Sequence, residues 1–355
     1  MNPINTHIHL FNKEDLPKNL FCGLISFFAG KHKALDWLLH NLIPGNKDKL
    51  DYYLNIINEG KNSEFEKFYD CQLNYPEDFK FITLTMDMAF MGAGKVKRDY
   101  SRQLTALSSL AELEKPRIFP FIHIDPRRKD IYQLFIEAVT QLNYRGIKLY
   151  PPLGIFPYDE RLLSIYDYCE KANIPIIAHC SPYNPIHFQG TDKELEKLLS
   201  QAKPPYLSDF ATHGLKRKEL CSQFTNPLNY ERLLIKYPKL RFNLAHFGSE
   251  YFWNKYLENQ NDQKNWVNII ITLMTKYKNC YTDLSYTFHN QKFFPILNDM
   301  LDNPEINGQI LFGTDFYMNM VEGTEKDFVN NLRWFLRQKK WELLSKINTN
   351  KFIYG

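Results

Sequence analysis

The chain has 355 residues, 44% of them hydrophobic and 24% charged, a composition typical of a globular protein that can bury a large core. The 44 basic and 40 acidic residues give a formal net charge of +4 without a long single-sign block, which argues against a nucleic-acid partner. The longest apolar stretch, residues 20–30, is too short for a membrane span, and the six cysteines lack C-x-x-C spacing, so we expect a cytoplasmic protein with reduced thiols.

Short β-branched or aromatic runs alternate with helical patterns along the chain. Eight such runs are predicted strands: residues 4–10, 81–88, 118–125, 144–150, 174–180, 241–247, 280–286 and 309–315. Helices are predicted over residues 130–142, 159–172 and 227–236, with Asp159 and Asn226 as N-caps. This alternation predicts one α/β domain over residues 1–355, a (β/α)8 TIM barrel whose active site lies at the C-terminal ends of its strands.

Two connections are longer than the loops that usually join a strand to a helix. Residues 11–80 follow the first predicted strand and include a helix-like piece at 34–39. Residues 181–225 follow the fifth and contain Pro204-Pro205 and His213-Gly214. We interpret both as insertions and expect them to fold over the barrel mouth.

The first predicted strand carries His7 and His9, which are two residues apart and therefore point to the same face. Such a pair can bind one metal ion, although a His-x-His pair alone is more often a solvated edge. Metal-competent residues also end four other predicted strands: Lys148, His179, His246 and Asp315. Because the strand ends of a barrel meet at one mouth, these residues together predict a metal site.

These residues lie in ordered motifs, namely His-x-His at 7–9, Gly-Ile-Lys-Leu-Tyr-Pro-Pro at 146–152, Ala-His at 178–179, Leu-Ala-His-Phe-Gly at 244–248 and Phe-Gly-Thr-Asp at 312–315. The set resembles the amidohydrolase superfamily, specifically its amidohydrolase-2 (amidohydrolase-related) branch of metal-dependent hydrolases, over nearly the whole chain apart from the insertions. The resemblance implies that His7 and His9 match the strand-one ligands, His179 the strand-five ligand and Asp315 the strand-eight carboxylate. His246 matches a histidine that either binds a second metal or contacts substrate.

Lys148 admits two interpretations. Its surroundings resemble those of the strand-four lysine that dihydroorotase-like relatives carboxylate to bridge two metals, and a desolvated amine beside cations is predisposed to the neutral form that this needs. Alternatively, it is unmodified and pairs with a carboxylate such as Asp125 or holds an anionic substrate. We therefore expect one or two divalent ions, with zinc favoured by the mixed imidazole and carboxylate donors and manganese, iron or nickel admitted.

The leading prediction is a metal-dependent hydrolase of a cyclic amide, a lactone or another small carbonyl substrate. A bound ion lowers the pKa of its water toward about 7 and polarises the carbonyl. Asp315 would be the general base, and His246 is the second catalytic candidate.

The alternative is a non-oxidative decarboxylase of an unsaturated or aromatic acid, a reaction that the same branch includes and that an arginine such as Arg128 would favour. A phosphoesterase or nuclease is disfavoured because Lys148 replaces a glutamate ligand. The complete ligand set disfavours a binding protein on a decayed barrel.

Substrate contacts are predicted for polar residues that end or flank other strands: Asp87, Asp125, Tyr150 and Ser285, with His123, Tyr286 and the insertion residues Tyr183 and His213 as further candidates. Structural hydrogen bonding explains each of them equally well. His32, His40 and His289 are expected at the surface, and Cys180 faces away from the site because it follows His179 on its strand. The sequence decides neither the small-molecule substrate nor whether the chain forms a homo-oligomer.

Overall fold

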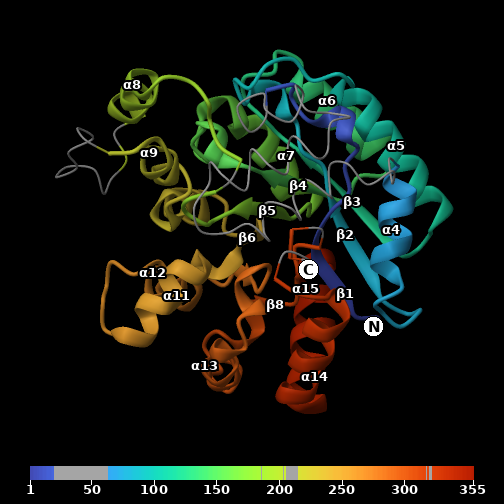
Figure 1. The fold of residues 1–355 in the computed structure, drawn as a ribbon, viewed down its shortest axis with the longest axis vertical. Helices are drawn as coiled ribbons and strands as arrows, with labels where there is room; N and C mark the ends of the chain where they lie inside the picture. The colour runs from blue at the N-terminus through green and yellow to red at the C-terminus, as the bar shows by residue number, and fades with distance from the viewer. Residues whose placement is uncertain (20–62, 185, 203, 205–214, 317, 320–321) are drawn as a thin grey trace, which may run out of the picture.

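The computed structural model describes residues 1–19, 63–184, 186–202, 204, 215–316, 318–319 and 322–355. Its eight strands are parallel and lie side by side in chain order (Figure 1). They are β1 (Ile4–His9), β2 (Lys80–Leu84), β3 (Ile118–His123), β4 (Gly146–Leu149), β5 (Ile176–His179), β6 (Phe242–Ala245), β7 (Cys280–Asp283) and β8 (Ile310–Leu311). Ile8 pairs with Phe316 beyond β8, which closes the sheet into the predicted (β/α)8 barrel.

Helices surround the strands and cover their outer face (Figure 1). They are α4 (Glu64–Gln72), α5 (Tyr100–Leu113), α6 (Ile131–Thr140), α7 (Leu163–Ala172), α8 (Asp192–Ala202), α9 (Arg217–Gln223), α10 (Glu231–Lys236), α11 (Ser249–Glu258), α12 (Trp266–Lys276), α13 (Phe294–Met300), α14 (Glu325–Glu342) and α15 (Asn348–Tyr354). The three predicted helices correspond to α6, α7 and α10. Asp159 and Asn226 cap the short 3-10 turns that lead into α7 and α10.

Apolar side chains fill the barrel beneath its mouth. Ile4, Ile82, Phe121 and Ile177 belong to this inner cluster, and α15 adds Phe352. Truncating such a buried phenylalanine to alanine lowers the free energy of unfolding by about 3–5 kcal/mol. Since this end is packed with side chains, the polar residues of the strands can meet only at the opposite, C-terminal end.

Gly146 at the start of β4 is required by this packing. A Cβ atom at this position would lie 2.2 Å from the ring of Phe121, which points into the same interior. The glycine therefore allows the large aromatic ring of β3 to fit beside β4, two residue pairs before Lys148, which pairs with His123.

The insertions lie only partly at the mouth as far as the structure describes them. In the first, Phe11 reaches the mouth, whereas α4 packs beside α5. In the second, residues such as Ser181 and Tyr183 line the mouth, whereas α8 and α9 lie together at one side of the barrel (Figure 1). The predicted helical piece at 34–39, together with His32, His40 and His213, lies outside the described residues.

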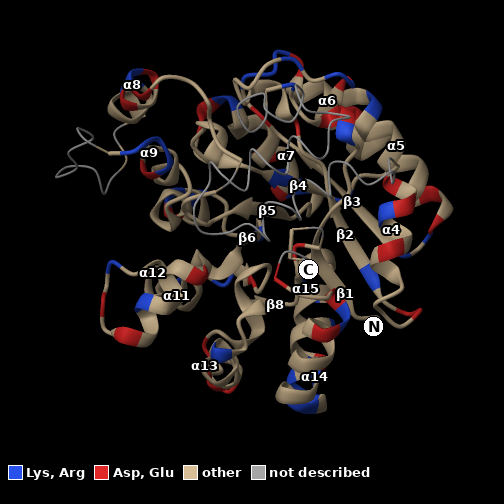
Figure 2. Cartoon of the chain, in the orientation of Figure 1, with Lys and Arg blue, Asp and Glu red and all other residues tan. Residues whose placement is uncertain are grey.

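Charged residues are dispersed over the outer surface. Figure 2 shows both signs interspersed along the outer helices, as the sequence predicts. The five cysteines of the described residues are buried and free. No helix in this part of the chain combines the length and the apolar character that crossing a membrane requires.

Candidate metal centre

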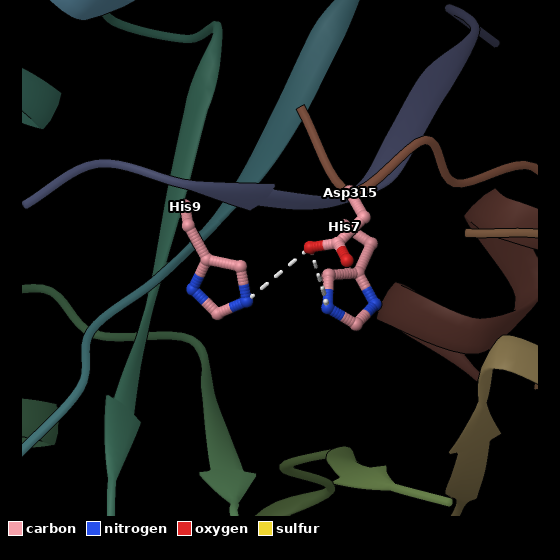
Figure 3. Close-up of side chains that lie close together, drawn as sticks. All are labelled: His7, His9 and Asp315. Atoms are coloured by element: carbon pink, nitrogen blue, oxygen red, sulfur yellow. Dashed lines mark ion pairs between the residues drawn. The ribbon is translucent and has the colours of Figure 1, made fainter. Parts of the chain in front are cut away.

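Three of the predicted ligands meet at the mouth of the barrel (Figure 3). Asp315 Oδ1 lies 3.7 Å from His7 Nε2 and 3.6 Å from His9 Nε2. These separations are too long for hydrogen bonds. They fit donors on one ion, because two ligands bonded at about 2.1 Å in a tetrahedral site lie about 3.4 Å apart. We call His7, His9 and Asp315 the triad.

Asp315 Oδ1 itself indicates that the triad suits a cation. The oxygen is buried and has no hydrogen-bond partner, which is unfavourable for a carboxylate unless a cation neutralises it. Burial raises the pKa of Asp315, while His7 and Lys148 oppose the rise. Imidazole and carboxylate donors in this arrangement fit a divalent ion such as zinc or manganese.

The backbone of Asp315 adopts an uncommon conformation that aims its side chain at the histidines. Its φ of 61° lies in the left-handed region. Its N–H donates to the carbonyl of His7 at 2.8 Å, and its own carbonyl accepts from the N–H groups of Met318 and Asn319. A non-glycine residue stays in this conformation only where its surroundings enforce it, so strand β1 and the turn after Asp315 are coupled.

Asp283, at the end of β7, orients His7. Its Oδ2 accepts from His7 Nδ1 at 3.1 Å and from Asn243 Nδ2 at 2.6 Å, and its Oδ1 accepts the backbone N–H of His246 and of Ser285. Burial would raise the pKa of Asp283, but His7, together with His246 and Ser285, holds it well below its ordinary value. His7 therefore donates from Nδ1, and its Nε2 lone pair is free to bind the ion that the triad would hold.

Asp283 was not among the predicted site residues. The predicted seventh strand ends at residue 286, so the predicted site includes only residues near that end, whereas β7 ends at Asp283. The alternation of side chains along a strand was the available signal, because Asp283 shares a face with Ser285.

His179 and His246 form a hydrogen-bonded pair beside the triad. His246 Nε2 and His179 Nδ1 are 2.9 Å apart, and the rings of His7 and His246 have centroids 4.9 Å apart. The other ring nitrogen of His179 hydrogen-bonds Asn184 Oδ1. Burial lowers the pKa of both histidines, that of His246 to about 3, so both are neutral at ordinary pH. His179 thus lies outside the group of three ligand atoms within 4.8 Å of one another, although it lines the same cavity as His9 and Asp315.

Lys148 borders the triad from β4. Its Nζ lies 3.1 Å from His7 Nε2 and the side chain is fully buried. Burial lowers the pKa of Lys148 to about 8, against the pull of Asp315 and Asp283. The suggested pairing with Asp125 is wrong, because Arg127 Nε holds that carboxylate at 2.8 Å. A neutral amine is thus accessible here at mildly alkaline pH, which the carbamate interpretation requires.

The triad opens into a cavity of about 260 Å³. His9, His179, His246 and Asp315 form its polar side. The remaining wall is mainly apolar or aromatic: Phe11, Met86, Met88, Tyr150, Pro182, Tyr183, Ile186, Tyr251, Tyr286 and Met318. Among the described residues the lining contains no lysine or arginine, and Glu250 and Asp315 are its acidic members.

The predicted substrate contacts separate into two groups. Tyr150 lines the cavity, and its hydroxyl donates to the carbonyl of Ile186 at 2.9 Å. The other three do not line it. Asp87 is held by Arg128 Nη2 at 2.7 Å, Asp125 is held by Arg127, and Ser285 is buried behind His246 with its Oγ 2.9 Å from Nδ1. Their roles in the described structure are structural hydrogen bonds and ion pairs.

Two other histidines, His123 and His289, do not line the cavity. His123 is buried on β3 and its Nδ1 accepts the backbone N–H of Asp87. His289 was expected at the surface, but it is half-buried and stacks on Phe328 at 4.3 Å. Burial lowers the pKa of His289 to about 4. Tertiary packing, which no local pattern reports, overturns this prediction.

A (β/α)8 barrel with imidazole and carboxylate donors around one point at its mouth defines the class of metal-dependent barrel enzymes. A family model described as amidohydrolase matches residues 4–346. The chain therefore belongs to the amidohydrolase family, and it is a metal-dependent enzyme of that superfamily. No curated protein sequence matches the chain.

Solved structures share the fold at low sequence identity. A manganese-bound 5-carboxyvanillate decarboxylase from Novosphingobium aromaticivorans is 11% identical, with a TM-score of 0.56 and coverage of 99% of this chain and 97% of that chain. A manganese-bound dihydroxybenzoic acid decarboxylase from Polaromonas is 13% identical, with a TM-score of 0.56 and coverage of 99% of this chain and 97% of that chain. A 4-oxalomesaconate hydratase from Rhodopseudomonas palustris is 12% identical, with a TM-score of 0.50 and coverage of 99% of this chain and 95% of that chain. At these identities the likeness supports the barrel and leaves the reaction open.

Proposed function

We propose that this protein is a metal-dependent hydrolase of a small, uncharged carbonyl compound such as a cyclic amide or lactone. The observation that carries the proposal is the cavity itself: His9 and Asp315 of the triad lie at its polar side, and the rest of the described wall is mainly apolar or aromatic and holds no lysine or arginine. A neutral planar substrate fits such a wall, whereas a carboxylate that lies against the wall and away from the ion would lack a cationic partner there. We also propose that residues 1–355 act as one domain.

The chain's own residues have distinct roles in this proposal. A divalent ion, when bound, supplies a Lewis acid for the carbonyl and an activated water. His7 and His9 would hold it through Nε2, with Asp283 fixing the tautomer of His7. Asp315 would take the proton released by the attacking water and return it to the leaving group, because its buried carboxylate has a raised pKa and reaches the cavity.

His246 would contact the substrate from the neighbouring wall. Its Nε2 faces His179 and its ring lines the cavity. Burial keeps the imidazole neutral, so the ring would contact the substrate without adding charge while its two nitrogens stay with His179 and Ser285. His179 stays a proposed ligand. To bind an ion through Nε2, it would have to give up its hydrogen bond with Asn184. Lys148 stays a proposed carbamate.

The proposal is tested by metal analysis combined with an assay on neutral lactones and cyclic amides. We expect about one equivalent of zinc or manganese per chain and turnover that chelation abolishes and either metal restores. His9→Ala should lose both the metal and the activity, whereas His289→Gln, outside the cavity lining, should keep both. A wild-type protein that binds neither metal would refute the proposal.

Decarboxylation is the competing outcome of the same experiment. It would release carbon dioxide from an unsaturated or aromatic acid without consuming water. Arg128, the arginine that would favour it, is held by Asp87 and does not line the cavity. Carbon dioxide release from aromatic acids, combined with no hydrolysis of any lactone or amide, would replace our proposal with this reaction.

A further inference from the structure

A buried polar network lies directly behind the triad and involves none of its ligands' metal-facing atoms. Its members are Asn5, Tyr75, Thr314, Asn319 and Glu325, all buried. They come from β1, from the segment after α4, from the turn after β8 and from the first turn of α14. The network therefore joins four parts of the chain at one point.

The orientation of Asn5 is determined by its backbone partners. Its Oδ1 accepts the N–H of His7 at 3.1 Å and the N–H of Thr314 at 3.2 Å. A backbone N–H can only donate, so the amide oxygen must face these two groups. The Nδ2 group consequently donates its two protons to the hydroxyls of Tyr75 and Thr314, each at 2.8 Å.

The direction of every other hydrogen bond follows from this assignment. Each hydroxyl receives a proton from Asn5 and so has its own proton left to donate. Both hydroxyls donate to Glu325 Oε1, that of Thr314 at 2.7 Å. Asn319 Nδ2 donates to Oε2. Glu325 thus receives three hydrogen bonds in this arrangement, as an ionised carboxylate does. Burial raises the pKa of Glu325, and these three hydrogen bonds oppose the rise.

The network connects two of the three triad residues. Asn5 holds the N–H of His7, and Thr314 precedes Asp315 directly in the chain. The backbone N–H of Asn319 also donates to the carbonyl of Asp315 at 3.1 Å. Since Asp315 stands in the left-handed region, the hydrogen bonds on both sides of it must hold that turn in place.

We propose that Glu325 is a positioning residue for the metal centre, because its carboxylate holds the turn that carries Asp315 against the strand that carries His7. This inference rests on the proposed function, in which the triad binds a divalent ion. Glu325 lies outside the lining of the cavity, so it acts through its hydrogen-bonded neighbours. Outer partners of this kind typically change metal affinity by about 10–100-fold.

The test is a titration of the metal-free full-length chain with Mn²⁺ by calorimetry. Glu325→Gln keeps the size of the side chain but removes its charge, so the hydrogen bonds from the two hydroxyls lose their charge assistance and Asn319 has to turn its amide over, since its Oδ1 has no partner in the wild type. We therefore expect binding about 10–100-fold weaker than in the wild type. Tyr75→Phe removes one of the two hydroxyl bridges and should weaken binding about fivefold, the equivalent of one net hydrogen bond. The control is Glu64→Gln, which alters another buried carboxylate that is bound by Arg98 and lies outside the cavity lining.

The outcomes separate the two proposals. Glu64→Gln should lower the thermal midpoint but bind Mn²⁺ within about twofold of the wild type, which shows that lost stability alone does not weaken the site. A wild-type chain that binds no Mn²⁺ would refute the proposed function and the positioning role with it. A wild type that binds Mn²⁺, with Glu325→Gln binding equally well, would refute only the positioning role. If Glu325→Gln does not fold, a Tyr75→Phe variant that binds Mn²⁺ with wild-type affinity would refute the positioning role.

Discussion

Replacing Asp283 by asparagine should change the tautomer of His7. The carboxylate accepts two backbone N–H groups on Oδ1 and the side chains of His7 and Asn243 on Oδ2. The new amide has a single oxygen, and it must face the backbone groups because they cannot rotate. Its NH₂ then faces His7 and Asn243.

The two side chains can respond differently to this NH₂ group. Asn243 can rotate its amide, since its Oδ1 has no partner in the wild type. His7 can accept only by moving its proton from Nδ1 to Nε2, the atom that faces Asp315. A protonated Nε2 cannot bind a metal ion. We therefore expect Asp283→Asn to weaken Mn²⁺ binding about 10–100-fold.

The same substitution should lower the free energy of unfolding by about 1.5–3 kcal/mol, the range for losing a hydrogen bond to a buried charged group. Urea unfolding of the metal-free chain measures this change. The depressed pKa of Asp283 sets its pH dependence: the stabilisation is complete above the unfolded-state pKa of about 4 and is lost as the pH falls toward the lower folded-state pKa. The difference between wild type and variant should therefore be constant at neutral pH and shrink in strong acid.

The control for this experiment is Asp302→Asn, because Asp302 is an exposed carboxylate that pairs with Lys340. It should change stability by less than about 1 kcal/mol and leave metal binding unaltered. Unchanged Mn²⁺ affinity in Asp283→Asn, together with the expected loss of stability, would show that Asp283 does not govern His7. A stability change no larger than that of the control would refute the account of the buried carboxylate.

Three further predictions concern the metal, pH and packing. Mn²⁺ at about 100 times its dissociation constant should stabilise the fold by about 2.7 kcal/mol and raise the thermal midpoint by several degrees, and the shift should be absent in His9→Ala; equal shifts in both would contradict the triad. His289 has a pKa of about 4, below its unfolded value, so its stabilisation is complete above about pH 6.5 and is lost as the pH falls toward 4. In the wild type, the free energy of unfolding measured with urea should therefore fall between pH 6.5 and 4, and His289→Phe should reduce this fall by about 1–3 kcal/mol. An equal fall in wild type and variant would argue against this role of His289. Gly146→Ala should cost about 1–3 kcal/mol by calorimetry because of its clash with Phe121, and a neutral result would show that the ring can move.

The strands and helices could be predicted because their signals are local. All eight strands occur where the apolar runs lie, and Asp159 and Asn226 cap the turns that lead into their helices. The predicted strands extend too far at their C-terminal ends; β2, for example, ends at Leu84 where the prediction continued to residue 88. There the chain leaves the sheet and bends into loops, so that Asp87 and Asp125 point to arginines and not into the cavity.

Residue type and order along the chain determined the barrel, the family and the candidate ligands, because His7, His9 and Asp315 stand at strand ends that a closed parallel sheet must bring to one mouth. Only the tertiary structure decided which of the candidates share a point, since that depends on distances of a few ångströms and on competing partners. Asn184 and His246 occupy the nitrogens of His179, and Arg127 occupies Asp125. Glu325 became visible only once folding placed it against residues distant in the chain, because hydrogen bonds of this kind leave no periodic trace in the sequence.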